Sequence, residues 1–405
     1  MPSRLTLVAS LIGAGAGIAT IAAVAQGINA GNRPALPDLP FTVTEIADFE
    51  APWALAVLPE GRLLVTEHDG RLFLVTPEGE KTEVANVPRV QVSGQLGLHD
   101  IAPAPDYAES GVVYLSYNAP GEDGSQIVLA RAVLRQGDGS AHLSDLTEIW
   151  RQPDGGGGGG HPGAIIAFDP AGEHVFLTVG ERTESETAQD PAMARGKILR
   201  LNLDGSAPAD NPWAGEGPVQ SFTWSTGHRN PYGLAFAPDG VLWEHEMGPR
   251  GGDEFNRIER GANYGWSDVS EGTNYDGSAI PGHETRPEYA APALYWTPVI
   301  APSGLSFYSG AMFPDWDGSA LIGALAGMAL VRVEIDEQGQ PDEAERFDMG
   351  TRIRDVAVAP DGAVWLIEDG DPGRLMRLTP EQPLAARGGC LPPLGLRPIH
   401  PRGYL

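Results

Sequence analysis

The chain contains the stretch Val356-Ala357-Val358-Ala359-Pro360-Asp361-Gly362-Ala363-Val364-Trp365-Leu366-Ile367, and this stretch decides the fold. Two short apolar runs flank a Pro-Asp-Gly turn, which is the pattern of a β-hairpin. The same phrase returns, with variants at the turn, in five other places. These copies are residues 55–65, 101–117, 166–179, 234–243 and 305–325. We therefore predict a chain built from a repeated hairpin unit.

A further β-rich run often follows the hairpin, as at residues 71–75, 198–201 and 375–378. Two or three linked strands cannot bury both of their faces alone, but six such sheets packed radially can, and only short edges then stay exposed. The prediction is an all-β fold, a six-bladed β-propeller of four-stranded antiparallel sheets. The alternative, a pair of β-sandwiches, does not explain why one turn phrase recurs along the whole chain.

Composition excludes several other classes of protein. The 405 residues include 53 glycines and 36 prolines, which argues for many short elements and against long helices. With 27 basic and 54 acidic residues, the formal net charge is −27. Such a chain repels phosphate backbones, so nucleic acids and anionic membrane surfaces are excluded as partners. The single cysteine, Cys390, cannot form an intramolecular disulfide.

The first thirty residues are typical of an export signal. Arg4 provides a positive charge, residues 5–24 are uncharged, and Ala23-Val24-Ala25 offers a cleavage site before Gln26. The alternative is an uncleaved N-terminal membrane anchor, which would be the protein's one contact with a membrane. Both interpretations predict a periplasmic or secreted protein. The propeller domain is then expected at residues 36–382, with a C-terminal tail at residues 383–405.

Five segments are too rich in polar residues and glycine to be structural hairpins. They are residues 93–97, 161–163, 226–231, 248–254 and 352–355. Most of them immediately precede or open a copy of the repeat, so a propeller would bring them together at one end of its central channel. Basic, amide and imidazole groups that converge in a concave mouth predict a binding site. The glycine run at residues 155–160 is expected to be an ill-ordered loop or a flexible rim over that site.

These segments resemble the soluble quinoprotein glucose/sorbosone dehydrogenases, and among them the aldose sugar dehydrogenases that depend on pyrroloquinoline quinone (PQQ). The matching phrases are Gly94-Gln95-Leu96-Gly97-Leu98-His99-Asp100, Gly227-His228-Arg229-Asn230-Pro231, Gly248-Pro249-Arg250-Gly251-Gly252-Asp253-Glu254, Ala301-Pro302-Ser303-Gly304-Leu305 and Arg352-Ile353-Arg354-Asp355-Val356. The resemblance runs from about Trp53 to Leu378. It implies a six-bladed propeller that oxidises aldose sugars at C1 to lactones and passes the electrons to an acceptor other than oxygen, whose identity the sequence does not reveal.

The resemblance also implies roles for individual residues. His161 lies in a His-x-Gly segment that matches the catalytic histidine of the family, so it is the expected general base. Arg229 would stabilise negative charge on the reacting quinone oxygens. Since PQQ carries three carboxylates, Arg229, Arg352 and Arg354 are the expected cofactor-binding cations.

Further polar and aromatic residues complete the expected cofactor site. Gln95 and Asn230 are expected to contact cofactor or substrate, and Trp296 either stacks on one of them or belongs to the core. The resemblance places Ca²⁺ against the backbone carbonyls of Gly248 and Pro249, with support from Glu254 and Tyr264 directly or through water. The resemblance thus implies a metal site formed by Gly248, Pro249, Glu254 and Tyr264.

Two departures from the family pattern limit what the resemblance implies. Met247 stands where relatives usually have histidine, and Ala326 stands where glucose-oxidising relatives carry a lysine toward the cofactor. The second change points away from a strict glucose dehydrogenase. Two other functions stay open: a non-catalytic propeller that binds carbohydrate or protein, and a calcium-dependent propeller lactonase. The second would require carboxylate and amide ligands from several blades, and the sequence shows no such set.

Overall fold

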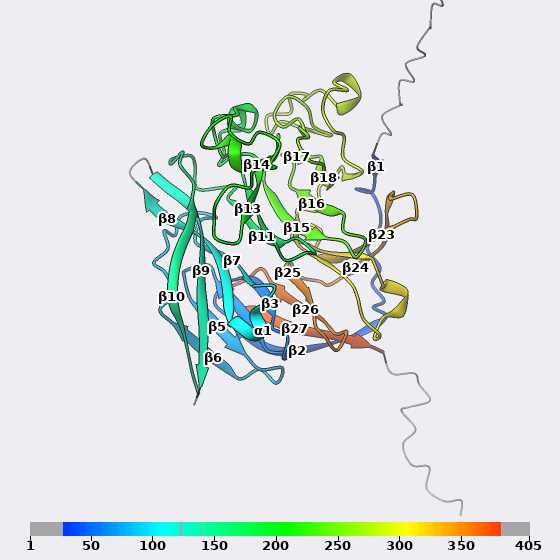
Figure 1. The fold of residues 1–405 in the computed structure, drawn as a ribbon. Coiled ribbons are helices and arrows are strands. Elements are labelled where there is room, and N and C mark those ends of the chain that lie inside the picture. The colour runs from blue at the N-terminus through cyan, green and yellow to red at the C-terminus, as the bar shows by residue number, and fades with distance from the viewer. Residues whose placement is uncertain (1–26, 122–123, 138, 382–405) are drawn as a thin grey trace, which may run out of the picture.

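The computed structural model describes residues 27–121, 124–137 and 139–381 (Figure 1). The predicted cleavage site and nearly all of the predicted export signal lie outside these residues, and so does the predicted tail with Cys390. Among the described helices, none combines the length and the apolar character needed to cross a bilayer.

The strands follow one another in antiparallel groups of four. The first group is β3 (Pro52–Val57), β4 (Leu63–Glu67), β5 (Leu72–Val75) and β6 (Lys81–Ala85), and the second is β7 (Leu98–Pro103), β8 (Val112–Gly121), β9 (Gly124–Gly137) and β10 (Ser140–Arg151). A short parallel pairing of β6 with β10 joins these two groups into one eight-stranded sheet. The third group is β11 (Gly163–Phe168), β12 (His174–Val179), β13 (Lys197–Asn202) and β14 (Thr223–Thr226).

The later groups complete the body. They are β15 (Pro231–Phe236), β16 (Leu242–Glu246), β18 (Asp253–Arg257) and β20 (Leu294–Trp296); β21 (Pro302–Phe307), β22 (Ala320–Ala324), β23 (Ala329–Ile335) and β24 (Pro341–Asp348); and β25 (Ile353–Val358), β26 (Val364–Glu368), β27 (Gly373–Pro380) and β2 (Phe41–Phe49). A small separate ladder joins β17 (Arg250–Gly251) to β19 (Gly272–Thr273). The described helices are single turns: α1 (Tyr107–Ser110), η1 (Ser185–Gln189), η2 (Gln220–Phe222), η3 (His283–Thr285) and η4 (Pro314–Trp316).

Each copy of the repeated phrase forms the first two strands of one group. In the stretch quoted first, Ala359 N–H donates to the Ala363 carbonyl at 2.9 Å, and Gly362 closes the turn at φ = +87°. The equivalent turn residue Gly240 has φ = +85°. Residues with a side chain rarely adopt this conformation, which explains why glycine ends the phrase. The all-β prediction is confirmed.

The first strands of the groups form a ring. β3, β7, β11, β15, β21 and β25 contact one another in that order, and β25 contacts β3. In the last group, β2 from the N-terminal part of the body pairs with β27 from the C-terminal part, so the chain closes the ring on itself (Figure 1). This closed arrangement of small sheets is the one expected of a β-propeller.

Three aspartates, of which Asp253 is buried and Asp100 and Asp355 are half-buried, link neighbouring groups of strands. Asp100 accepts a hydrogen bond from Ile166 N–H at 2.8 Å, and Asp355 accepts one from Leu55 N–H at 2.7 Å. Asp253 accepts from two successive backbone N–H groups at the start of the next group, at 2.8 and 2.7 Å. These carboxylates satisfy N–H groups that would otherwise be buried without a partner.

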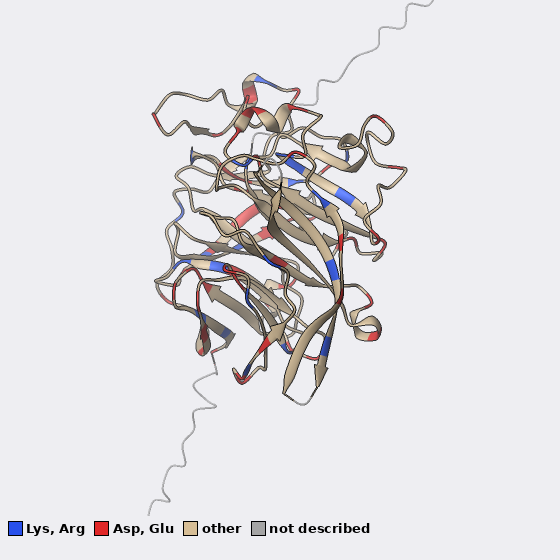
Figure 2. Cartoon of the chain, turned by 90° about the vertical axis from the view of Figure 1, so that its left-hand side faces the viewer, with Lys and Arg blue, Asp and Glu red and all other residues tan. Residues whose placement is uncertain are grey.

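The packed body begins before Leu36, the predicted start of the domain. β1 (Ile28–Asn29) pairs in parallel with β20, and Ala30 is 1% exposed within the core. Because Ala30 is packed, residues 27–30 are part of the described body. In Figure 2, many of the acidic residues lie on turns and loops, and most of the strand ribbon is uncharged.

Candidate active site

His161 precedes β11 and is held by three neighbours. Its backbone N–H donates to Gln95 Oε1 at 2.8 Å, its carbonyl accepts from Arg182 N–H at 3.3 Å, and its Nδ1 pairs with the Glu181 carboxylate. The His161 side chain is 16% exposed and that of Glu181 only 2%, so the imidazole is the part of the pair that a ligand can reach. With Nδ1–H donating to a carboxylate, Nε2 is left as the free basic nitrogen.

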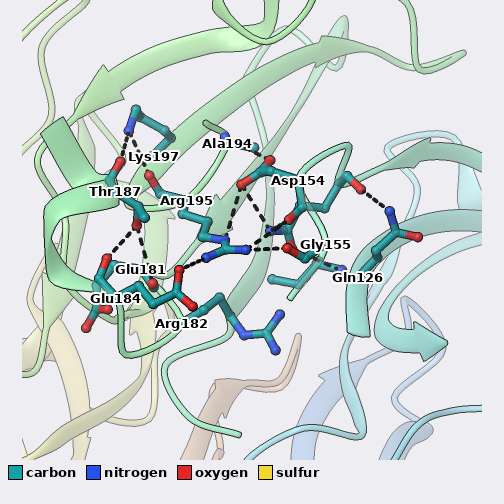
Figure 3. Close-up of polar contacts among 12 residues, drawn as sticks. Gln126, Asp154, Gly155, Glu181, Arg182, Glu184, Thr187, Ala194, Arg195 and Lys197 are labelled. Atoms are coloured by element: carbon teal, nitrogen blue, oxygen red, sulfur yellow. Dashed lines mark hydrogen bonds and ion pairs between the residues drawn. The ribbon is translucent and has the colours of Figure 1, made fainter. Parts of the chain in front are cut away.

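The glycine run at residues 155–160 is an ordered segment held by hydrogen bonds. It is not the ill-ordered loop that was one of the two expectations for it. Gly158 and Arg182 exchange hydrogen bonds, from Gly158 N–H to the Arg182 carbonyl at 2.7 Å and from Arg182 Nη2 to the Gly158 carbonyl at 3.0 Å. Figure 3 shows the Arg195 guanidinium between Glu184 on one side and Asp154 and Gly155 on the other.

The close packing explains why these positions are glycine. A Cβ on Gly158 would lie 2.0 Å from Thr183 Oγ1, which is far inside contact distance. The segment ends beside the site, because the Gly159 carbonyl accepts from Gln95 N–H at 2.7 Å. The run therefore holds Gln95 through the Gly159 carbonyl and leads directly into His161.

Gln95 connects His161 to an aromatic wall. Its Oε1 also accepts from the Tyr232 hydroxyl at 3.2 Å, and the Tyr232 ring meets the Trp53 ring edge-on at 6.2 Å. The Arg354 guanidinium lies 4.2 Å above the Trp53 ring, a cation–π contact. Trp53, Tyr232 and Arg354 themselves line a cavity of about 210 Å³, whose lining includes residues from the first strand of every group.

Arg352 and Arg354 share one acid. Arg354 Nε donates to Asp369 Oδ1 at 2.9 Å, and Arg352 Nε donates to Asp369 Oδ2 at 2.6 Å. The two guanidinium groups hold the pKa of the Asp369 carboxyl below its usual range, although burial acts in the opposite direction. Two positive charges against one negative charge leave a net positive charge at this side of the site.

Arg229 has no acidic partner at its guanidinium among the described residues. Nη1 donates to the Met247 carbonyl at 2.9 Å and Nη2 to the Tyr275 hydroxyl at 3.2 Å, while Nε is buried without a partner. The residue is 5% exposed, and its guanidinium lies 5.3 Å from the Trp266 ring. A buried cation without a counter-charge is costly unless an anion from outside the chain supplies one.

Backbone contacts bring Arg229 and Asn230 to the His161 pair. The Arg229 carbonyl accepts from Glu181 N–H at 2.9 Å, and Asn230 Oδ1 accepts from Gly163 N–H at 3.3 Å. The structure thus joins six of the predicted residues in one chain of contacts. They are Gln95, His161, Arg229, Asn230, Arg352 and Arg354.

Trp296 is not part of this site. Its side chain has no exposed surface, and its indole Nε1–H donates to Glu343 Oε2 at 2.6 Å within the core. A fully buried ring has no face to offer a sugar or a quinone, so the prediction of a stacking role disagrees with the structure. Tyr275, which the sequence analysis missed, is 71% exposed and lies beside Arg229.

The four predicted metal residues divide into two pairs. Within the described residues, no hydrogen-bond donor contacts the carbonyls of Gly248 and Pro249, while Gly248 N–H is held by Asp253 Oδ1 at 2.8 Å. Met247, just before them, accepts from Arg229, so both carbonyls lie next to the candidate cofactor site. Oxygen atoms free of protein donors are what Ca²⁺ requires, and this pair fits the ion.

Glu254 and Tyr264 do not fit a calcium site. The Tyr264 hydroxyl donates to the Arg257 carbonyl at 2.5 Å and accepts from Glu259 N–H at 2.9 Å. Its backbone carbonyl accepts from the ring of His283 at 3.1 Å. Burial raises the pKa of the Glu254 carboxyl to about 8, and one of its oxygens accepts from Asn256. Donors already engage both Tyr264 oxygens and one Glu254 oxygen, so the two residues are not placed together as calcium ligands.

The sequence analysis also missed Glu181, Trp53 and Asp369, which hold the predicted residues in place. A single acidic residue after a strand, as in Val179-Gly180-Glu181, has no spacing that marks it. The clearest signal is that two charged residues, Glu181 and Arg182, follow closely after a strongly apolar strand.

Comparison with known proteins identifies the family of the chain. The family model described as "Glucose / Sorbosone dehydrogenase" matches residues 49–377. The aldose sugar dehydrogenase YliI of Escherichia coli is 36% identical over 337 residues, covering 81% of this chain and 90% of the relative.

Solved structures agree as well. A crystal structure of a glucose dehydrogenase has a TM-score of 0.79 at 42% identity and covers 83% of this chain and 99% of its own. The PQQ-bound form of an aldose sugar dehydrogenase from Streptomyces coelicolor has a TM-score of 0.66 at 30% identity, with 85% and 99% covered. The chain belongs to the glucose/sorbosone dehydrogenase family and is an oxidoreductase that acts on the CH–OH groups of sugars.

Proposed function

We propose that this protein is a PQQ-dependent aldose sugar dehydrogenase with a six-bladed propeller, and that it oxidises aldoses at C1 to lactones. The observation that carries the proposal is the His161–Glu181 pair, whose backbone is joined to Arg229, together with the buried Arg229 guanidinium that has no acidic partner in the described residues. The names of two similar proteins support it, because one is an aldose sugar dehydrogenase and the other was solved with PQQ bound.

Proton removal is assigned to His161. Its Nε2 accepts the proton of the C1 hydroxyl, while Nδ1–H continues to donate to Glu181. The Glu181 carboxylate keeps the ring in the required tautomer and stabilises the imidazolium that forms. Glu181 is therefore a positioning residue, and Gln95 has the same role for the backbone of His161.

Cofactor binding is assigned to the positive groups around the site. PQQ, when bound, supplies the two-electron acceptor, and its carboxylates match the guanidinium groups of Arg229, Arg352 and Arg354. Asn230 and Gln95 offer amide contacts. The exposed Tyr275 ring, held at Arg229, offers a stacking surface. The Gly248 and Pro249 carbonyls would hold Ca²⁺, which polarises a carbonyl oxygen as a Lewis acid.

The proposed setting follows from the first thirty residues. We infer export to the periplasm or the cell exterior, with membrane contact limited to an uncleaved leader. The electron acceptor there is a small molecule or protein that the sequence does not identify. Nucleic acid is not a partner of a chain with a net charge of −27.

Reconstitution tests the function. Purified protein is supplied with PQQ and Ca²⁺ and then with a panel of aldoses, and the reduction of an artificial dye is followed. We expect sugar-dependent reduction and quinone absorbance that survives desalting. A protein that reduces no dye with any sugar and retains no quinone contradicts the proposal and favours a non-catalytic binding propeller. Lactone hydrolysis without dye reduction contradicts it in favour of a lactonase.

A further inference from the structure

A second polar cluster is buried in the β15–β20 group, on the face turned toward β12 and β13. On the ladder of β16 with β18, Glu244 pairs with Asn256 and Glu246 pairs with Glu254, so these four side chains share one face. The same face of β16 carries Leu242, which packs with residues of β12 and β13. His228 joins the cluster from the segment before β15, stacked on Tyr264 at 4.9 Å.

The hydrogen bonds within the cluster engage one of the two polar side-chain atoms on each of Glu246, Glu244 and His228. Glu246 Oε2 accepts from Arg229 N–H and, at 3.2 Å, from Asn230 N–H. Glu244 Oε2 accepts from Asn256 Nδ2 at 3.1 Å, and His228 Nε2 contacts Ser225 Oγ at 2.9 Å. Each of these three side chains thus has one polar atom engaged and one left over.

The remaining polar atoms of His228, Glu244 and Glu246 lie close to one another. His228 Nδ1 and Glu244 Oε1 are buried without a hydrogen-bond partner in the described part of the chain, and both residues are 0% exposed. Glu246 Oε1 lies 3.5 Å from His228 Nδ1, too long for a hydrogen bond. One ligand atom from each of the three residues lies within 4.8 Å of the other two.

These atoms need a positive partner. Glu244 and Glu246 are carboxylates on one buried face, and no Lys or Arg side chain pairs with either among the described residues. In the tautomer whose Nε2–H donates to Ser225 Oγ, His228 Nδ1 is a third acceptor. A proton can join two acceptors, whereas a metal ion satisfies three at once.

We propose that His228, Glu244 and Glu246 bind one divalent metal ion, at a site separate from the Gly248 and Pro249 carbonyls. One imidazole nitrogen and two carboxylate oxygens form a mixed donor set, which suits Zn²⁺ or Mn²⁺ better than the oxygen-binding ions Ca²⁺ and Mg²⁺. Metal–ligand bonds of about 2.0–2.4 Å fit three atoms at this spacing.

The ion would also support the active site. Glu246 holds the backbone N–H groups of Arg229 and Asn230, so fixing its carboxylate fixes the turn that presents both residues. The role is structural, because the cluster is closed to solvent and a substrate cannot reach it.

Metal binding to the full-length protein tests this site. Protein stripped with a chelator is titrated with Zn²⁺ alone and with Mn²⁺ alone, without PQQ or calcium, and the retained metal is measured by mass spectrometry after gel filtration. We expect one equivalent of either ion per chain and a metal-dependent rise in Tm. Wild-type protein that retains neither ion overturns the proposal whatever the variants do.

Variants locate the site. Glu244→Gln keeps the side-chain shape but removes the charge, and it is expected to weaken binding about 100-fold or more. Glu259→Gln, at an exposed position just beyond β18, is the control and should bind as the wild type does. If Glu244→Gln does not fold, His228→Gln replaces it. Binding by a folded variant that equals the wild type refutes the assignment, since the ion then binds elsewhere.

Discussion

At the residue scale, the chemistry depends on a histidine in an unusual backbone conformation. His161 has φ = +50°, which a residue with a Cβ adopts only when its surroundings impose it. Gln95 and Arg182 impose it by hydrogen bonds to the His161 N–H and carbonyl. The result is an imidazole that faces Glu181 on one side and the site on the other.

Replacement of either member of the pair separates catalysis from binding. His161→Ala removes the proposed base and should lower kcat by about 10²–10⁴-fold while PQQ binding persists. Glu181→Gln keeps a hydrogen-bond acceptor at Nδ1 but loses the charge that stabilises the imidazolium, so kcat should fall with little change in KM. Steady-state kinetics and quinone absorbance after desalting measure both effects. Simultaneous loss of turnover and quinone binding in His161→Ala would show that the residue is structural.

Arg229 allows a second prediction at this scale. Arg229→Lys keeps the positive charge but loses the planar guanidinium group, whose two Nη atoms donate to the Met247 carbonyl and to the Tyr275 hydroxyl. Loss of one charge-assisted hydrogen bond, worth about 1.5–3 kcal/mol, should raise the Kd for PQQ about 10- to 100-fold. Titration of the protein with PQQ measures it. Tyr275→Phe, which keeps the ring and loses only the hydroxyl, should bind PQQ more tightly than the lysine variant; equal affinities would count against this role for the guanidinium group.

At the element scale, aspartates connect the groups of strands. Asp100 on β7 accepts from Ile166 N–H on β11 and from Ile101 N–H, both at 2.8 Å. Asp100→Ala leaves two N–H groups without a partner, at about 1–3 kcal/mol for each that is buried. The free energy of unfolding should therefore fall by about 2–5 kcal/mol, as measured by urea denaturation. Asp38→Ala, at an exposed position, should change it by less than about 0.5 kcal/mol, and an equal effect of both would contradict the linking role.

The strands could be predicted from the sequence because each hairpin depends on its own turn. Pro360-Asp361-Gly362 and the other turns encode their geometry locally, so every copy of the phrase became the start of a group. Contacts between distant elements left no such signal. The burial of Trp296 includes a hydrogen bond from its indole N–H to Glu343, which is far away in sequence. The Tyr264 carbonyl accepts a hydrogen bond from the ring of His283, another residue that the local sequence does not connect to it.

The same limit applies to the site. Residues in the polar segments before the hairpins could be found from the sequence, since a ring of sheets collects the ends of its first strands. Glu181, Asp369 and Tyr275 could not, because their roles come from the partners His161, Arg354 and Arg229. Glu244 belongs with them: an acidic residue in an apolar strand looks exposed until the neighbouring group of strands covers it.

At the scale of the whole molecule, the ring places carboxyl groups around its buried axis. Asp100 and Asp355 line the same cavity and repel each other across it. Burial raises the pKa of Asp100 to about 7, and burial together with the charge of Asp100 raises the pKa of Asp355 to about 8. In the unfolded chain both would titrate near 4. These two groups thus bind more protons in the native protein than in the unfolded chain between about pH 4 and pH 8.

This difference predicts how stability depends on pH. A group with a raised native pKa contributes stability that is complete below its unfolded pKa and is lost as the pH rises through its native pKa. Other buried groups also titrate, such as Lys197, whose pKa burial lowers to about 7, so one carboxyl is best isolated by a variant. Asp355→Asn imitates the protonated carboxyl at every pH. From pH 5 to pH 8 the free energy of unfolding of the wild type should fall relative to the variant, by at most about 1.4 kcal/mol per pH unit. Urea denaturation of both proteins at several pH values, in high salt to screen the surface charges, measures the difference. A difference that stays constant with pH, or changes with the opposite sign, would show that Asp355 is ionised in the native ring throughout this range.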